Sequence, residues 1–504
     1  MRFNFLRGAQ NETLNYEGAK AFILTPHLEL YTAVATAGLS DKFYENADAG
    51  LNRIKALIAK NDAQFTAKLA VYAREQMYLR SVPLVLTVEL AKQHNGDGLV
   101  AALTERVIQR ADEITELLSY YALSNERKDV KQLNKLSKQL QKGLAAALNR
   151  FDEYQFAKYN RDANVKLKDA LFLVHPKAKD EKQQALFDKI VKDELQTPYT
   201  WETELSALGQ QAYDTAELKQ QAVKAKWEEL VLSNKLGYMA LLRNLRNVLE
   251  AEVSNEALEK ACAYLSNQKA VANSKQFPFR FLAAYRELAA VKSGHVATVL
   301  DALEKAMLHS AANIAGYDAD TRVVIAADMS GSMQTPLNAK STVQRYEVAL
   351  VLAMLLQSRC KNVVAGIFGQ TYKQVQLPHS NILSNTQQLS NMIGEVGHST
   401  NGYLVIADLL KRRMVVDKVM LFTDLQLWND TGNTSIAELW KQYKKMEPGA
   451  KIYLFDLAGY GNTPLNVLRD DVFLISGWSD KIFNVLSAVE NGSDAVEMIE
   501  AIQL

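Results

Sequence analysis

The chain has 504 residues, of which 48% are hydrophobic and 23% are charged, which is the composition of a folded protein with two or three domains rather than of a disordered chain. Its net charge of +1 favours neither acidic nor basic partners. Lys and Arg exceed Asp and Glu by 42 to 38 up to residue 310 and are outnumbered 16 to 19 thereafter. A nucleic-acid surface must therefore come from the placement of charge.

Cysteine use and hydropathy indicate a cytoplasmic protein. The two cysteines, Cys262 and Cys360, lie far apart and exclude a disulfide framework. No apolar run reaches the roughly 18 residues of a membrane span, so we expect no contact with a membrane. The first residues also lack an apolar segment of signal-peptide length.

Residues from about 20 to 310 have almost entirely helical patterns. Apolar residues recur at three- and four-residue spacing in segments such as Leu51–Ala59, Phe65–Leu79, Leu99–Leu118 and Ala216–Leu232. Breaks fall near Gly38, Asn95–Gly96, Pro176, Pro198, Asn267 and Pro278. Helical hairpins of this length suit a HEAT-like stack, and an irregular helical domain is the alternative.

After about residue 318 strands and helices alternate. The expected strands are Arg322–Ala327, Asn362–Phe368, Lys373–Leu377, Lys418–Phe422, Ile452–Leu457 and Val472–Ile475. The expected helices are Val343–Ser358, Gln387–Ile393, Tyr403–Arg412, Ser435–Lys444 and Asp480–Ala488. Nearly continuous apolar strands predict a mostly parallel, doubly wound sheet covered on both faces. The fold is thus α followed by α/β, with domains at 1–315 and 316–504.

Hydroxyl and carboxylate side chains follow three of these strands. Asp328, Ser330 and Ser332 end the first strand, Thr400 lies in a loop before a helix, and Asp424 ends another strand. Ligands bind at this edge of open α/β sheets, and hard oxygen ligands suit Mg²⁺ or another divalent cation. Taken singly, Ser399 or Thr400 could cap the following helix and Asp424 could be a turn residue.

The motifs D-M-S-G-S-M, H-S-T-N-G and F-T-D resemble the metal-ion-dependent adhesion site of von Willebrand factor A domains, from about Arg322 onward. This resemblance implies Mg²⁺ at the top of a Rossmann-like sheet. It also implies an open metal position that takes a carboxylate from a partner protein. Ser399 is the alternative to Thr400 in the second motif.

A second resemblance spans nearly the whole chain. The segments T-W-E from Thr200, K-W-E-E-L from Lys226 and L-G-Y-M-A-L-L-R-N-L-R-N from Leu236 are similar to the TROVE-module family of the Ro autoantigen. This implies a monomeric ring of HEAT-like repeats closed by the A domain. It also implies binding of a Y-like non-coding RNA outside the ring and of single-stranded 3′ ends of misfolded RNA in its hole. An exoribonuclease is an implied partner, in RNA quality control.

Several basic residues are candidates for RNA contact. One set forms a stripe within roughly 80° of a helix and could neutralise phosphates or simply be a solvated face: Lys128, Lys131, Lys135, Lys138 and Lys142. The family resemblance adds Lys158, Arg161, Lys168 and His175. The chain departs from the family pattern at Asp162 and Phe172, where basic residues are expected.

Other functions are weighed against the RNA-binding scaffold. Arg243 and Arg246 share a helix face and either line a pore or pair with acids such as Glu228. A metal-dependent protein-adhesion module is the main alternative function. A metal-dependent hydrolase is disfavoured, because His398 is the only general-base candidate beside the metal motifs and no paired carboxylates or catalytic triad are evident. No catalytic residue is assigned.

Overall fold

The computed structural model describes residues 11–40, 42, 44–127, 136–160, 163–338, 341–429 and 434–504. These residues form two compact units, which are considered separately here. One unit comprises the described residues up to Gly50 together with Ala216–Ala495, and the other comprises Leu51–Thr215 with Val496–Leu504. None of the described helices has the length and hydropathy to cross a membrane.

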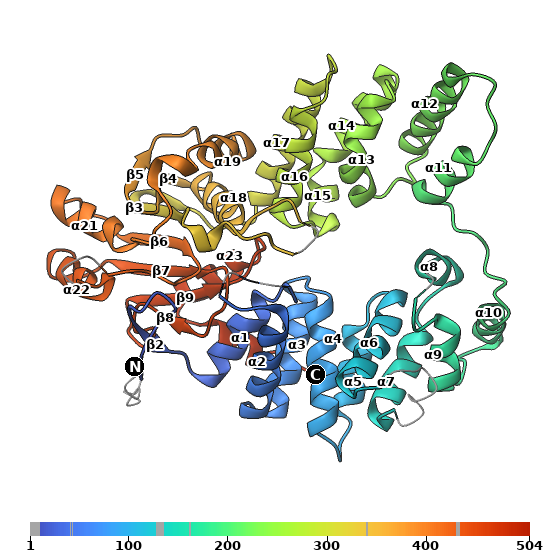
Figure 1. Cartoon of the computed structure of the whole chain (residues 1–504), viewed down its shortest axis with the longest axis horizontal. Helices are drawn as coiled ribbons and strands as arrows, with labels where there is room; N and C mark the ends of the chain where they lie inside the picture. Colours follow the sequence, from blue (N-terminus) through green and yellow to red (C-terminus); the bar gives the residue numbers. More distant parts are fainter. Residues whose placement is uncertain are drawn as a thin grey trace. The chain divides into compact units, whose positions relative to one another are not determined.

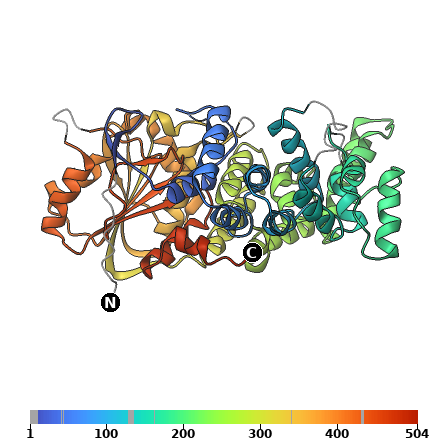
Figure 2. The same cartoon turned by 90° about the horizontal axis from the view of Figure 1, so that it is seen from below.

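The unit that contains Leu51–Thr215 is a stack of helices. They are α2 (Ala47–Lys60), α3 (Ala63–Glu75), α4 (Ser81–Gln93), α5 (Leu99–Val107), α6 (Ala111–Ser124), α7 (Lys138–Leu148), α8 (Glu153–Tyr159), α9 (Leu167–Val174), α10 (Glu181–Val191) and α11 (Trp201–Gly209), followed at the chain end by α24 (Ala495–Glu500). Helix α3 packs on both α4 and α5, α4 packs on α6, and α5 packs on α7 (Figures 1 and 2). Such contacts between each helix and the next but one are those of stacked helical hairpins. Closure into a ring stays a prediction.

The segment Leu99–Leu118, whose apolar spacing is helical throughout, is divided in the structure into α5 and α6. Arg110 is extended, with φ −140° and ψ 149°. The carboxylate of Glu113 accepts the amides of Gln109 and Arg110 at 2.8 and 3.1 Å, so it caps the start of α6. It also binds the Arg74 guanidinium from α3 at 2.9 Å. Apolar periodicity continues across this break and conceals it.

The other unit holds a second group of packed helices. They are α12 (Ala216–Leu232), α13 (Tyr238–Glu250), α14 (Asn255–Leu265), α15 (Gln268–Ser274), α16 (Pro278–Ala289) and α17 (Val296–Ala311). The expected breaks at Asn267 and Pro278 are confirmed, since Asn267 caps α15 and Pro278 is the first residue of α16. Helix α12 coincides with the predicted Ala216–Leu232.

The same unit contains the predicted sheet, with strand order β5-β4-β3-β6-β7-β9. The strands are β3 (Tyr317–Asp328), β4 (Cys360–Phe368), β5 (Tyr372–Val375), β6 (Lys418–Thr423), β7 (Lys451–Asp456) and β9 (Val472–Ser476). The helices between them are α18 (Arg345–Gln357), α19 (Ile382–Asn391), α20 (Ile393–Val396), α21 (Tyr403–Arg412), α22 (Ile436–Met446) and α23 (Ile482–Glu490). All neighbouring pairs are parallel except β4 and β5, so the mostly parallel sheet is confirmed.

Both faces of this sheet are buried, as its apolar strands predict. On one face, Val324 and Ala326 of β3 share a core with Leu409 of α21 and Trp440 of α22. Helix α18, which packs on β3, β4 and β6, is buried along its whole length. Figure 1 shows α21 and α22 beside the sheet on the side away from α18.

The sequence predicted helical structure from about residue 20, but in the structure the described residues before Pro26 form no helix. Strands β1 (Glu12–Leu14) and β2 (Lys20–Ile23) form an antiparallel hairpin, and β2 pairs with β8 (Asn462–Thr463) beside the large sheet. The helical region begins with α1 (Pro26–Ala35). A strand of four residues gains its stability from a partner more than 400 positions away, which local patterns do not reveal.

Candidate functional site

The first predicted metal motif forms a buried loop at the C-terminal end of β3. Asp328 and Ser330 are fully buried and Ser332 is nearly so. Asp328 Oδ1 accepts the Ser330 amide at 2.9 Å, and the hydroxyls of Ser330 and Ser332 lie 3.3 Å apart. The chain then makes one short 3₁₀ turn over Gly331–Met333. This local turn holds all three oxygen-bearing side chains on one side of the strand end.

The loop that carries Thr400 joins this edge. The Gly331 amide donates to the His398 carbonyl at 2.8 Å, which ties the two loops together. Thr400 is 3% exposed, whereas Ser399 is partly exposed. Helix α21 begins after Gly402, and no side chain caps it. The helix-capping alternative for Thr400 therefore does not hold, and its hydroxyl is left for another role.

Asp424 follows β6 in the middle of the sheet. Its Oδ1 accepts the Gln426 amide at 3.0 Å, in the turn that the alternative interpretation anticipated. Its Oδ2, however, is buried without a hydrogen-bond partner among the described residues. A buried carboxylate oxygen that lacks a donor is costly, so this atom indicates a missing positive partner.

The preceding residue, Thr423, was not predicted to be part of the site. Its Oγ1 donates to Asp328 Oδ2 at 2.6 Å and accepts the Leu425 amide at 3.1 Å. Thr423 thus connects the two carboxylate loops. The F-T-D motif contained this residue, but nothing in the sequence showed that its hydroxyl would point at Asp328.

The electrostatics of these groups fit a divalent cation. Burial, and then the nearby Asp424, raise the pKa of Asp328 to about 7. Burial also raises the pKa of Asp424, against the opposing effects of Ser332 and the buried Arg345. Asp328, Ser330, Ser332, Thr400 and Asp424 would hold the ion, which would supply the positive charge that two buried carboxylates lack.

Hydroxyl ligands are essential to this assignment. In the part of the chain that the structure describes, no group of three or more His, Cys, Asp or Glu side chains could hold a metal. His398, the only candidate base, is exposed and its Nδ1 lies 2.9 Å from Gln334 Nε2. A divalent cation at this site would therefore depend on the hydroxyls of Ser330, Ser332 and Thr400 as well as on the two carboxylates.

The predicted RNA-contacting residues lie on α7, α8 and α9. Lys138 and Lys142 are exposed on α7, where Gln141 Nε2 donates to the carbonyls of Leu173 and Val174 at the end of α9. This contact places the exposed His175, which ends α9 with φ 49°, next to α7. Lys128, Lys131, Lys135 and Arg161 lie outside the described residues.

Exposed aromatic rings accompany these basic groups. Phe172 is 57% exposed and Tyr154 is 47% exposed. Lys168, Phe172 and His175 share a face of α9 by their spacing, and Lys158 Nζ lies 5.6 Å from the centre of the Tyr154 ring. Lys168 also pairs with Asp193 at 2.7 Å. Phe172, a departure from the family pattern, therefore offers a stacking surface instead of a charge.

Three arginines, Arg243, Arg246 and Arg280, line a pocket of about 240 Å³ between α13 and α16. Burial, and then the neighbouring Arg243, lower the pKa of Arg280. Arg246 pairs instead with Glu250 at 2.8 Å and Glu287 at 3.5 Å, and not with Glu228, which accepts the Ser254 amide. Two cations held together favour an anionic ligand.

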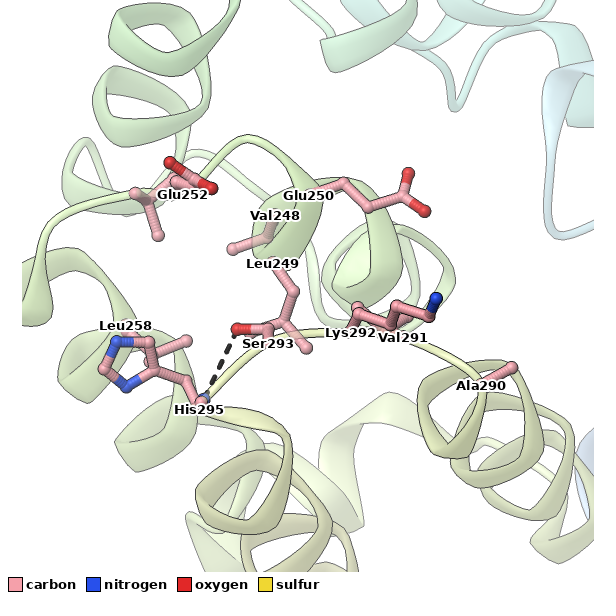
Figure 3. Close-up of a pocket in the computed structure, with 12 residues that line it drawn as sticks. Val248, Leu249, Glu250, Glu252, Leu258, Ala290, Val291, Lys292, Ser293 and His295 are labelled. Atoms are coloured by element: carbon pink, nitrogen blue, oxygen red, sulfur yellow. Dashed lines mark hydrogen bonds between the residues drawn. The ribbon is translucent and has the colours of Figure 1, made fainter.

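A larger pocket of about 730 Å³ lies where α13, α14 and the start of α17 meet (Figure 3). Charged residues on its wall include Glu250, Glu252 and Lys292. The hydrogen bond drawn there joins the His295 amide to Ser293 Oγ at 3.3 Å. None of the residues predicted for metal or RNA binding lines it.

Comparison with known proteins matches the chain to two family models. The model described as TROVE domain matches residues 6–195 and 192–315, and the model described as Ro60 vWA domain matches residues 322–488. The RO (RSR) protein of Deinococcus radiodurans has a similar solved structure, with a TM-score of 0.59 and 17% identity over 93% of this chain and 100% of that chain. At this identity the likeness concerns the fold.

Two curated relatives share a shorter stretch. Telomerase protein component 1 of Rattus norvegicus is 43% identical over 94 residues, and that of Mus musculus is 42% identical over 91 residues. These stretches cover 19% and 18% of this chain and only 3% of each relative.

Proposed function

Because the chain belongs to the TROVE domain family, we propose that it is a non-catalytic RNA-binding scaffold of the Ro type. The pairing of exposed cations with exposed aromatic rings on α8 and α9 is the observation that carries this proposal. Lysines attract the phosphate backbone, and exposed rings stack on unpaired bases. The exposed rings of Phe172 and Tyr154 lie outside the helical core, so a ligand can reach them.

The finer part of the proposal concerns which RNA is bound where. We assign a Y-like RNA to the surface that carries Lys138, Lys142, Lys158 and His175, and single-stranded 3′ ends to the surface that carries Arg243 and Arg280. The chain would act as a monomer in the cytoplasm, in RNA quality control, with an exoribonuclease as a partner. The adjacent arginines support the second assignment, because a phosphate would relieve their mutual repulsion.

A salt titration tests RNA binding directly. Affinity is measured for a structured RNA with a single-stranded 3′ tail, for the same RNA without the tail, and for a matched DNA. We expect tight binding that falls steeply with salt and that favours the tailed RNA. Absence of binding at low salt would contradict the proposal. Equal affinity for tailed and untailed RNA would contradict the assignment of 3′ ends alone.

A second proposed function is metal-dependent binding of an acidic residue from a partner protein. The orphaned Oδ2 of Asp424 supports it, because Mg²⁺ would satisfy this atom. The two functions respond to different reagents. EDTA is expected to abolish protein binding at the metal site and to leave RNA binding intact, whereas salt is expected to weaken RNA binding.

Catalysis is tested with the same materials. The purified protein is expected to leave RNA intact during prolonged incubation with Mg²⁺. Turnover of RNA that disappears in the Asp328→Ala variant would contradict the scaffold proposal, since it would assign hydrolysis to the metal site.

A further inference from the structure

The N-terminal hairpin is fastened to the loop that follows Asp424. Asn15 is buried, and its Nδ2 donates to the Leu427 carbonyl at 2.8 Å. The amide of Tyr16 donates to Gln426 Oε1 at 2.9 Å. The Oδ1 atom of Asn15 accepts the amides of Glu17 and Ala19, so the hairpin turn has a defined shape. This turn therefore presents Glu17 at the edge of the sheet where the metal ligands lie.

Two aromatic donors hold the Glu17 carboxylate. The Tyr44 hydroxyl donates to its Oε1 and the Trp428 indole Nε1 donates to its Oε2. Trp428 also contacts the loop of the proposed metal ligand Thr400, because its amide donates to the Thr400 carbonyl at 2.9 Å. The Tyr44 ring stacks on Tyr16 with centres 5.0 Å apart. These contacts form a clamp with one donor for each carboxylate oxygen.

The hairpin also meets the loop that carries the proposed ligand Asp424. Gln426 of that loop accepts the Tyr16 amide at its Oε1 and donates its own amide to Asp424 Oδ1 at 3.0 Å. Glu17 is therefore held beside the loop that runs from the proposed ligand Asp424 to Trp428.

We propose that Glu17 is an internal competitor at the metal site: the N-terminal hairpin holds the chain's own carboxylate where an acidic residue of a protein partner approaches. The partner binds when Glu17 leaves the clamp, and the partner's carboxylate then takes the open metal position with Tyr44 and Trp428 as hydrogen-bond donors. This inference rests on the proposed metal site. Glu17 lies beside the proposed ligands and is not counted among them.

The hairpin is suited to exchange. Its link to β8 consists of two residue pairs, Phe22 with Thr463 and Ile23 with Asn462, at the far end from the turn. Glu17 is partly exposed, so its release uncovers little apolar surface. A carboxylate that leaves is hydrated by water, and the incoming carboxylate meets the same two donors. The exchange therefore replaces one carboxylate with another on the same two donors.

The test compares the variant Glu17→Gln with a control, Glu12→Gln. Glu12 is another carboxylate of the hairpin, and it pairs with Lys20 of the neighbouring strand at 2.7 Å. Calorimetry first measures binding of Mg²⁺ alone, and then of the peptide Ac-Gly-Glu-Gly-NH₂ to the Mg²⁺-saturated protein. Glu17→Gln is expected to bind the peptide about tenfold more tightly than wild type, because the clamp is vacated. Glu12→Gln is expected to match wild type.

The outcomes separate this inference from the metal site itself. If Mg²⁺ binds but the peptide affinity of Glu17→Gln equals or falls below that of wild type, the competitor role is overturned. If no variant, wild type included, binds Mg²⁺, the metal site is overturned and the inference with it. Tyr44→Phe provides a second reading, because it removes one donor from Glu17 and from the incoming carboxylate alike. Its peptide affinity is expected to stay close to that of wild type, and a tenfold rise would overturn exchange on shared donors.

Discussion

The edge of the sheet and the surface of helices α7 to α9 both carry charged residues, but they hold them in opposite ways. Asp328 and Asp424 are 0% and 1% exposed, so neighbouring atoms determine how readily they ionise. Lys142 and Lys158 are exposed and form no ion pair with any residue that the structure describes. Water and dissolved salt surround them, so their number and spacing matter most.

This difference predicts how each region fails. A single change at the buried edge is expected to alter pKa values, metal affinity and stability together, because each atom there has a specific partner. On the helical surface, single changes are expected to be small and cumulative. The following expected effects, from the largest free energy to the smallest, test that contrast.

The largest effect concerns Asp456, a buried carboxylate at the end of β7 that is not a proposed metal ligand. Burial raises its pKa to about 6, although it accepts the amides of Ala458 and Gly459. Since the folded pKa lies above the unfolded value of 3.8, the protein loses stability as pH rises from about 4 to 6. The loss from this group is roughly 3 kcal/mol.

Urea unfolding across this pH range measures the effect. Asp456→Asn is expected to remove that part of the pH dependence, and Asp320→Asn, an exposed control on β3, is expected to retain it. If the free energy of unfolding varied with pH in the same way in wild type and Asp456→Asn, burial would not raise the pKa of this carboxylate.

The next effect is the stabilisation by Mg²⁺. At 100 times the dissociation constant, a ligand specific to the folded state contributes about 2.7 kcal/mol, which is a rise of several degrees in unfolding temperature. Asp328→Ala is expected to abolish this rise and to leave RNA affinity mostly unchanged. Asp320→Asn, on the same strand, serves as the control. Equal Mg²⁺ stabilisation of both variants would contradict the metal assignment, and joint loss of RNA binding would show that the two regions are coupled.

Charge reversal on the helical surface follows. The double variant Lys142→Glu and Lys158→Glu is expected to weaken RNA binding by about 30-fold at low salt and to reduce the salt slope by about 1.8, because two phosphate contacts are lost. Lys219→Glu with Lys269→Glu, on α12 and α15, makes the same change in net charge elsewhere. If both double variants lose affinity equally, total charge and not this surface governs RNA binding.

The smallest effect concerns the ion pair between Lys168 and Asp193. Asp193→Asn frees the lysine and suits the positive φ of 57° at this position. Because the pair is exposed, stability is expected to change by less than about 1 kcal/mol. RNA affinity, measured by the same titration, is expected to rise about two- to threefold as Lys168 becomes available. A fall in affinity would place Lys168 outside the RNA contact.

Much of the fold was predictable because local patterns and tertiary packing agree. The helix Tyr403–Arg412 matches its prediction, and β4, β6 and β7 lie within two residues of theirs. The apolar spacing of Leu99–Leu118 did not reveal the break at Arg110. The break is stabilised by the buried Glu113 carboxylate, which accepts the amides of Gln109 and Arg110. The strand at Lys20–Ile23 was missed because its partner at Asn462–Thr463 is remote in sequence.

Residue order alone was enough to predict the family, the parallel sheet and a set of oxygen-bearing residues at three strand ends, because parallel strands bring their C-terminal ends to one edge. The three-dimensional structure was needed to show that Asp424 Oδ2 lacks a partner among the described residues, that Thr423 connects the two carboxylate loops, and that Tyr44 and Trp428 hold Glu17. The last two findings depend on hydrogen bonds between residues 95 and 411 positions apart in the chain. Such bonds follow from how side chains pack in three dimensions, and no spacing along the chain encodes them.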